Sequence, residues 1–320
     1  MKPSSGLAAS VSALLAIVLI GYLCRSQAVI HASGQNKPEV ITSGRPLNDA
    51  AWLLEGRYLR PITYEETIWL WPGDKGPWPN MIGLVPKERS FILPSGLSPD
   101  RTPVLDETVL RKVLDAYHSQ TDGPRFRVLT SNYGLHIVPV KARDASGTWV
   151  DVRSPLDSFI DLPVTSRTPM EHFIAFCRAV TEACGVVVKP MAHWLDQIFF
   201  PPGTAFFPKD RDMTEEEKRA ISITWGGRMR ARDALINLVQ LSDTTLTWKL
   251  RCSAEPDQFY DGNYGCGLNL GSIMIKNIRA DGSVGYIPRS FQEETSRAGM
   301  KRRPIASVIL PDRASNLKRS

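Results

Sequence analysis

Histidine and cysteine are both scarce in this chain, with five of each in 320 residues. The sequence also contains no Gly-x-Ser-x-Gly nucleophile elbow, no His-Glu-x-x-His zinc motif and no glycine-rich phosphate loop. These absences argue against the hydrolases, metalloproteases and nucleotide-binding enzymes that use those motifs. Among the histidines, only His193, beside Trp194 and Asp196, has surroundings suited to a site, and His136 is expected to point outward from a strand.

Long apolar runs are absent except near the N-terminus, where residues 7–24 form an almost unbroken one. Arg25 ends this run, and the small residues Ser26 and Ala28 occupy the two positions that a signal peptidase reads. The run has no amphipathic stripe, which argues against a buried core helix. Its length, about eighteen residues, lies between a signal-peptide core and a short membrane-spanning helix. We therefore predict that residues 1–28 are a signal peptide or a membrane anchor, and that the remainder is exported to the periplasm or cell envelope.

A charge excess is missing from the body of the protein, although the net charge is +6. Residues 289–320 hold eight Lys and Arg against three acidic residues, so this stretch carries +5 of the total. A nearly neutral body argues against nucleic-acid binding, which requires a basic face on the fold itself. We expect residues 279–320 to form a polar, basic and disordered tail; the alternative is a tail that contacts an acidic partner or a membrane surface.

The cysteines beyond the apolar run fall into two pairs. Cys252 and Cys266 flank a polar segment between two strand-like runs, and we predict a disulfide that closes a loop of about fifteen residues in an oxidising compartment. Cys177 and Cys184 lie on one predicted helix, where their Cα atoms would be about 10.5 Å apart, too far for a disulfide. They are interpreted as small buried hydrophobic residues. No further ligands at metal-site spacing accompany either pair, so neither a metal nor another cofactor is expected.

The apolar periodicity indicates four units in which a helix is followed by a strand. Leu47, Ala50, Ala51 and Leu54 share one helix face in the first unit. Residues 168–171, Thr-Pro-Met-Glu, form a capping box that starts the third helix. With a short strand before each helix, the predicted order is β-α-β-β-α-β-β, twice. We predict an α+β fold with two tandem modules, at residues 37–142 and 155–278, each with two helices against one mixed sheet.

Two stretches resemble the secretin and TonB receptor N-terminal (STN) module. The first is GRPLNDAA at residues 44–51, with Leu54 and then PITY at 61–64; the second is MRARDALINLV at 229–239, followed by LTW at 246–248. The resemblance covers residues 40–140 and 159–275. It implies non-catalytic periplasmic modules that bind partner proteins or pack into rings. The chain departs from the family in two long insertions, 69–89 and 191–219, and no pore or receptor barrel is recognisable after the second module.

Both insertions are rich in aromatic residues next to proline and glycine. Such a loop either forms an exposed aromatic surface that binds glycan or a partner protein, or folds back; the first loop would then cap the core of the first module. We take the aromatic residues as candidates for partner binding: Trp69, Trp71 and Trp78 in the first insertion, and Phe199, Phe200, Phe206 and Phe207 in the second.

The sequence therefore predicts an exported, non-catalytic envelope protein that mediates protein–protein interaction or assembly. Its partner would be another envelope protein or a second copy, with membrane contact only through the N-terminal helix or the basic tail. One alternative is an envelope hydrolase acting on glycan or peptidoglycan, with Glu65, Glu66 or His193 in the chemistry. The other is a purely structural envelope component.

Overall fold

The computed structural model describes residues 38–77, 83–95, 97, 105–191, 214–242, 245–278 and 284–288. In these residues the protein is mixed α+β, with five α-helices and several β-sheets. The predicted signal or anchor segment, residues 1–28, lies outside them. Part of the predicted disordered tail lies within the described residues. There, residues Val284–Pro288 form strand β15, which pairs antiparallel with β14 (Met274–Ile278). The prediction of disorder was wrong for these five residues.

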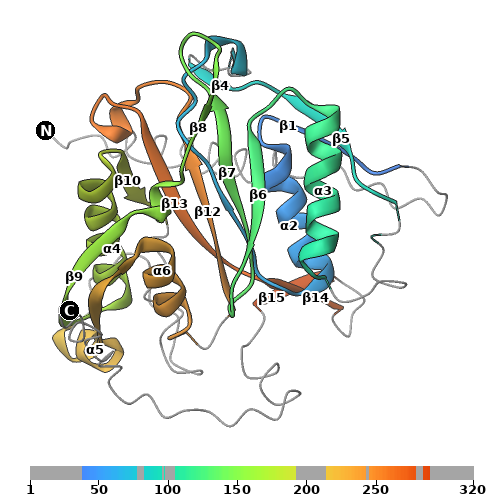
Figure 1. The fold of residues 1–320 in the computed structure, drawn as a ribbon. Helices are drawn as coiled ribbons and strands as arrows, with labels where there is room; N and C mark the ends of the chain where they lie inside the picture. The colour runs from blue at the N-terminus through green and yellow to red at the C-terminus, as the bar shows by residue number, and fades with distance from the viewer. Residues whose placement is uncertain are drawn as a thin grey trace, which may run out of the picture.

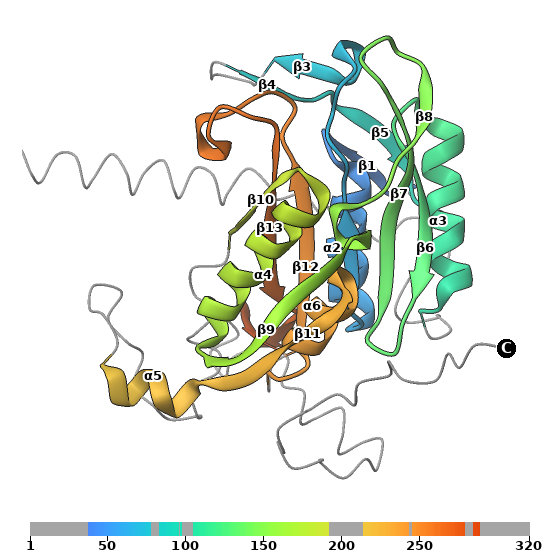
Figure 2. The ribbon, with the colours of Figure 1, turned by 60° about the vertical axis from the view of Figure 1, so that its left-hand side comes forward.

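A seven-stranded sheet runs through the middle of the molecule (Figures 1 and 2). Both halves of the chain contribute strands to it, and β12 and β2 lie side by side at its centre. The order is β10 (Val187–Pro190), β13 (Gly265–Ser272), β12 (Leu246–Cys252), β2 (Ile62–Glu65), β7 (Leu135–Arg143) and β6 (Arg125–Thr130), with β8 (Trp149–Asp151) also paired to β7.

Helices cover both faces of this sheet. One face carries α2 and α3 and the other carries α4 and α6, whereas α5 lies away from the sheet (Figure 2). The helices span Pro46–Tyr58 (α2), Glu107–Gln120 (α3), Pro169–Cys184 (α4), Glu215–Ile221 (α5) and Ala231–Val239 (α6). Three further two-stranded sheets complete the described part: β1 (Val40–Ser43) with β5 (Arg89–Ile92), β9 (Phe159–Arg167) with β11 (Ile223–Arg230), and β3 (Lys75–Pro77) with β4 (Leu84–Pro86).

Local sequence signals account for the helix ends. The predicted capping box is present in α4, where Thr168 accepts from the Glu171 amide and the Glu171 side chain accepts from the Thr168 amide. The same helix stops at Gly185, whose φ of 73° lies in the left-handed region. Cys177 is buried in the core and Cys184 is half-buried, and both are free thiols, as predicted.

The alternation of side chains along the strands creates two hydrophobic cores. Ile62 and Tyr64 of β2 face the core beneath α2 and α3, which we call the first core. Trp248 and Leu250 of β12 face the core beneath α4 and α6, the second core. The neighbours of these residues in each strand therefore point to the opposite face.

The two halves of the chain meet where β2 pairs in parallel with β12. The sequence predicts a separate sheet for each half, and the structure differs because this pairing makes one continuous sheet. Lys249 is opposite Tyr64 in the register, and the Glu66 amide donates to the Leu250 carbonyl at 3.0 Å. We call this pairing, with the side chains that cross it, the β2–β12 junction.

Two buried ion pairs cross the β2–β12 junction, one on each face of the sheet. On the first-core face, Lys249 Nζ lies 2.9 Å from Glu55 Oε2 of α2. On the second-core face, Arg232 of α6 binds both oxygens of Glu65, at 2.8 and 2.7 Å. Burial lowers the pKa of Lys249 and raises the pKa of Glu55, and in each case the attraction of the partner opposes the shift.

The predicted disulfide between Cys252 and Cys266 is confirmed, and it joins β12 to β13 at directly opposed positions. Because the two cysteines are 14 residues apart, the chain-entropy model assigns the bond about 3 kcal/mol of stability. We therefore expect Cys252→Ala/Cys266→Ala to lower the free energy of unfolding by about that amount in denaturant titrations. Reducing agent should destabilise the parent protein and leave this variant unchanged. A Cys184→Ala variant, which keeps the bond, serves as the control, and equal sensitivity of all three proteins to reductant would contradict the assignment.

Candidate functional site

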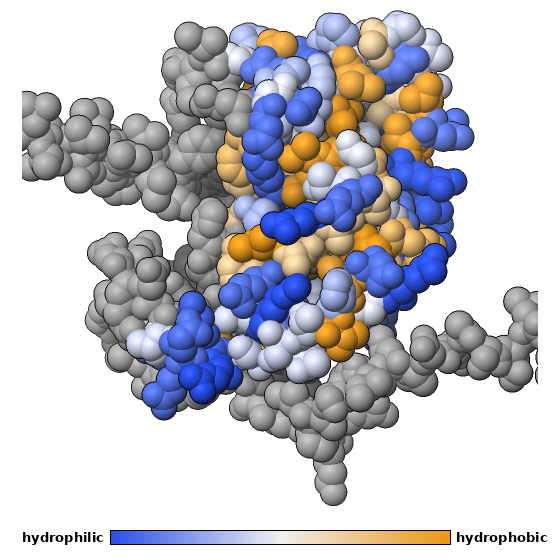
Figure 3. All heavy atoms as spheres, turned by 90° about the vertical axis from the view of Figure 1, so that its left-hand side faces the viewer, coloured by the Kyte–Doolittle hydropathy of each residue, from blue (hydrophilic) through white to orange (hydrophobic). Residues whose placement is uncertain are grey.

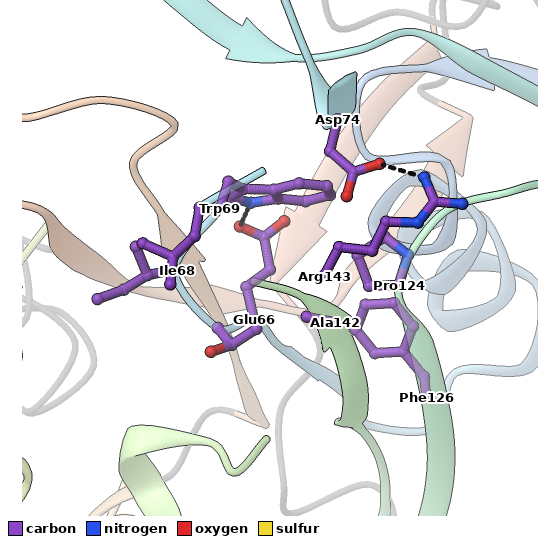
Figure 4. Close-up of a pocket in the computed structure, with 10 residues that line it drawn as sticks. Glu66, Ile68, Trp69, Asp74, Pro124, Phe126, Ala142 and Arg143 are labelled. Carbon is purple, nitrogen blue, oxygen red and sulfur yellow. Dashed lines mark hydrogen bonds and ion pairs between the residues drawn. The ribbon is translucent and has the colours of Figure 1, made fainter. Parts of the chain in front are cut away.

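The chain leaves β2 at Glu66 and runs through a short segment that ends in a 3₁₀ turn at Pro72–Asp74. Glu66, Trp69, Asp74, Phe126 and Arg143 line a hollow beneath this segment (Figure 4). The hollow has room for about one water molecule, so it does not accommodate a sugar ring or a peptide. The features of interest are the side chains that surround it and the surface that they support.

Trp69 lies on the inner side of this segment and is 6 % exposed. Its indole packs with the second core, and its Nε1 donates to Glu66 Oε2 at 3.2 Å. Trp69 thus follows the alternative in which the aromatic loop folds back, but it packs with the second core rather than the core of the first module, and it presents no surface to a partner.

Glu66 is buried among hydrogen-bond donors. Its carboxylate accepts from Arg45 Nε at 2.7 Å, from the Cys252 amide at 2.8 Å, from the Tyr64 hydroxyl at 3.0 Å and from Trp69 Nε1. A carboxylate offers about four lone-pair sites, so these donors use its capacity. The arrangement fixes the end of β2 and leaves no oxygen for a substrate or an attacking water.

Glu65 points to the other face of the sheet and is also fully buried. Besides the two bonds from Arg232, it accepts a long bond from Trp248 Nε1 at 3.4 Å. Arg232 reaches Asp157 as well, at 2.7 Å. Burial lowers the pKa of Arg232, but the two carboxylates outweigh that effect and raise it overall. The adjacent acids therefore belong to two separate structural networks, and no pattern in the sequence predicts their arginine partners.

His136 was expected to face solvent, and this prediction was wrong. The imidazole is buried, with Nδ1 2.9 Å from Thr63 Oγ1 and Nε2 2.7 Å from Ser131 Oγ, and it stacks on Trp248 at 5.3 Å between ring centroids. It does point away from α2 and α3, but the second half of the chain covers that face of the sheet. Burial lowers the pKa of His136 to about 4.

The outer side of the segment carries a series of stacked arginine and tryptophan side chains. The Arg143 guanidinium lies 4.1 Å from the ring centroid of Trp71 and 4.7 Å from that of Trp149, and Arg125 lies 5.4 Å from the Trp149 ring. Trp149 is 37 % exposed, and Trp71 is half-buried. We call these four residues the Arg–Trp ladder. Trp71 was a sequence candidate, whereas Trp149 was missed because it lies alone in a polar stretch.

An ion-pair cluster holds the ladder in place. Arg89 is buried and donates to Asp74, and its Nε donates to Asp122 at 2.9 Å. Arg143 Nη1 lies 3.6 Å from Asp74 and 3.7 Å from Asp122. Burial raises the pKa of Asp74, while the two arginines oppose the shift. Because Arg143 is held from below by carboxylates, its planar group is kept between the two indoles.

The remaining sequence candidates lie outside the described residues. They are Trp78, His193, Phe199, Phe200, Phe206 and Phe207. Within the described ranges there is no group of three or more His, Cys, Asp or Glu side chains that could hold a metal ion. Nor does any helix of the described part reach the length and hydropathy needed to cross a membrane.

Comparison with known protein families, curated proteins and solved structures finds no match to this chain.

The two tryptophans should differ in their effect on stability. Trp69→Ala removes a buried ring from the second core and should lower the free energy of unfolding by about 3–5 kcal/mol. Trp149→Ala removes a partly exposed ring that only stacks on arginines, and should cost about 1 kcal/mol or less. Denaturant titration of both variants measures the difference. Equal losses would show that one of the two environments is misassigned.

The burial of His136 makes a pH-dependent contribution to stability. Its pKa falls from 6.5 to about 4 on folding, so the unfolded chain binds the proton more readily. The contribution is present above pH 6.5 and is lost as the pH falls toward 4, by roughly 3 kcal/mol at most. A His136→Asn variant cannot titrate, so its stability should decline less than that of the parent protein over this interval. Parallel stability–pH curves for the two proteins would refute the assignment.

Proposed function

We propose that this chain is a non-catalytic, exported envelope protein that binds a partner protein through the Arg–Trp ladder. The observation that carries the proposal is the stacking of Arg143 between Trp71 and Trp149 at the surface. Tryptophan and arginine are the residues most enriched at the energetic centres of protein interfaces. Because carboxylates already hold Arg143, little side-chain freedom is lost on binding.

We further propose that the two halves are duplicated STN-like modules. Three strand pairings support this: β1 with β5 matches β9 with β11, β2 with β7 matches β10 with β13, and β6 with β7 matches β12 with β13. In both halves, the first of these pairings is antiparallel, the second is parallel and the third is antiparallel.

A shared hydrogen bond between helix and strand supports the duplication in more detail. In the first half, the Ile62 amide donates to the Glu55 side chain at 2.9 Å. In the second half, the Val188 amide donates to the Thr181 side chain at 2.9 Å. Each acceptor lies four residues before a left-handed C-cap, Leu59 or Gly185. Such modules bind partner proteins in the family that the sequence resembles, and the disulfide is consistent with export.

The hydrolase alternative is less well supported, because Glu65 and Glu66 are both occupied by donors within the fold. A purely structural role leaves the exposed ladder unexplained. The side of the molecule that carries α4, β9 and β10 shows hydrophobic side chains in small groups between hydrophilic ones (Figure 3). Its exposed Phe159 is already stacked beneath Arg230 at 5.2 Å. That side is therefore a weaker candidate for the partner-binding surface than the Arg–Trp ladder.

Site-specific photo-crosslinking in cells that produce the protein tests the ladder. Benzoylphenylalanine in place of Trp149 should give a discrete adduct with a second protein. The same group in place of Phe259, which is 43 % exposed but lies outside the ladder, should give none. Trp71→Ala in the same chain should reduce the adduct at position 149 at least about threefold, because it removes one side of the Arg143 sandwich. Equal labelling from both positions, or from neither, would contradict partner binding at the ladder.

A further inference from the structure

The central sheet ends at β6 on the side of α3, and no described strand pairs with the outer edge of β6 (Figure 2). The corresponding strand of the second half, β12, is not an end strand, because its outer edge takes β2. The duplicated halves thus contain one closing strand whose edge is occupied and one whose edge is open. The contacts at the occupied edge therefore indicate which kind of segment the open edge can bind.

The strand registers match individual residues of the two edges. Ile62 is opposite Leu135, and its counterpart Val188 is opposite Cys266. Two residues further along these strands, Ile137 of β7 corresponds to Leu268 of β13. Ile137 is opposite Val128 of β6, and Leu268 is opposite Leu250 of β12. Arg127 in β6 therefore occupies the position that Lys249 occupies in β12. Both side chains point away from the helices of their own half.

At the occupied edge, the cation is fully satisfied. Lys249 is 2 % exposed; it pairs with Glu55 and donates to the Ile62 carbonyl, and Trp52 lies 5.5 Å from its Nζ. The neighbouring strand supplies the backbone bonds, including the Glu66 amide to the Leu250 carbonyl. A closing strand with a cation at this position therefore receives a parallel strand together with a carboxylate.

At the open edge, no described strand and no carboxylate meets these two requirements, although the Phe126 amide already donates to His118 Nε2 at 3.0 Å. Arg127 is exposed and has no ion-pair partner in the described part of the chain. Arg125 precedes it on the same strand and reaches Trp149 of the Arg–Trp ladder. Exposed sheet edges pair readily with extended segments, and charged residues on an edge repel segments of the same sign.

We propose that the outer edge of β6 binds an extended acidic segment of a partner protein as an added parallel strand, with a carboxylate against Arg127. This proposal rests on the proposed partner-binding function and places the partner's segment next to the Arg–Trp ladder.

A second copy of the chain does not fit this edge. The strand of a second copy that corresponds to β2 is β10, and Thr181 already satisfies both the amide and the carbonyl of Val188 in that strand. Pro190 of β10 has no amide to donate. Thr181 also stands where Glu55 stands in the first half, so β10 brings no carboxylate for Arg127. The occupant is therefore a different protein.

Peptide binding to the full exported chain tests the proposal. The probe is an eight-residue peptide of alternating glutamate and valine, and its control alternates lysine and valine. The acidic peptide should bind, should shift and protect the amide signal of Val128 in NMR spectra, and should leave the amides of β10 unchanged. Binding of the lysine peptide with equal affinity, or shifts confined to β10, would overturn the proposal.

Three variants, each checked for folding by circular dichroism, isolate Arg127. Arg127→Glu should raise the Kd at least about tenfold, and Arg127→Lys should change it by less than about threefold, because a cation remains. Arg228→Glu makes the same charge change on an exposed residue of β11 and should leave the Kd unchanged. Equal Kd values for the two glutamate variants would refute a role for Arg127.

Crosslinking separates this proposal from the proposed function. If Arg127→Glu abolishes the adduct at position 149, both proposals stand. If the adduct persists in Arg127→Glu while peptide binding is lost, the ladder binds a partner but the β6 edge is not its docking site, and the edge proposal fails alone. If no adduct forms but the peptide binds at β6, the ladder assignment fails alone. Self-association of the parent protein that Arg127→Glu abolishes in light scattering would make the occupant a second copy and overturn the edge proposal.

Discussion

The pairing of β2 with β12 is the constraint on which the rest of the structure depends. Lys249 and Glu65 are both buried in strands, and each finds its partner on a helix of the other half of the chain. An unpaired buried charge is strongly destabilising, so neither half is satisfied without the other. The pairs also fix the register. A shift of β12 by one residue would move Lys249 to the second core, away from Glu55, and would displace Trp248.

Glu66 connects the β2–β12 junction to the surface that carries the Arg–Trp ladder. This residue directly follows β2, and its carboxylate accepts hydrogen bonds from Arg45, Trp69 and the Cys252 amide. The direction of the chain after the strand is thereby set, and Trp71 emerges against Arg143 rather than in solvent. The disulfide between Cys252 and Cys266 holds the other side of the same contact, because Cys252 supplies the amide. A change at the junction would therefore be transmitted to the Arg–Trp ladder, although none of the junction residues belongs to it.

The sequence was informative where the physics is local. The capping box at Thr168 and the disulfide across one hairpin each depend on residues close in the chain, and both were predicted. The junction was not, because Arg232 and Glu65 are 167 residues apart and their pairing follows from a topology that periodicity does not reveal. Glu65, Glu66 and His136 were placed at the surface or in a possible site because polar residues are rarely buried, and that rule fails at a contact between two halves. Trp69 and Trp71 are two residues apart yet lie in different environments, which composition cannot distinguish.

The proposed duplication gives these differences a common origin. If both halves began with the same pairings, each would have had one edge like β2 and one like β12. One pair of edges is now joined within the chain by buried ion pairs, which make that contact selective rather than merely apolar. Of the two edges left over, β10 is closed by Thr181 and Pro190, so the joined molecule does not extend in that direction. The β6 edge keeps the exposed cation of Arg127, and its Phe126 amide is bonded to His118. Because β6 contains no proline, its outer edge beyond Phe126 keeps the backbone donors that a pairing strand requires, and this difference from β10 is the argument for an occupant at β6.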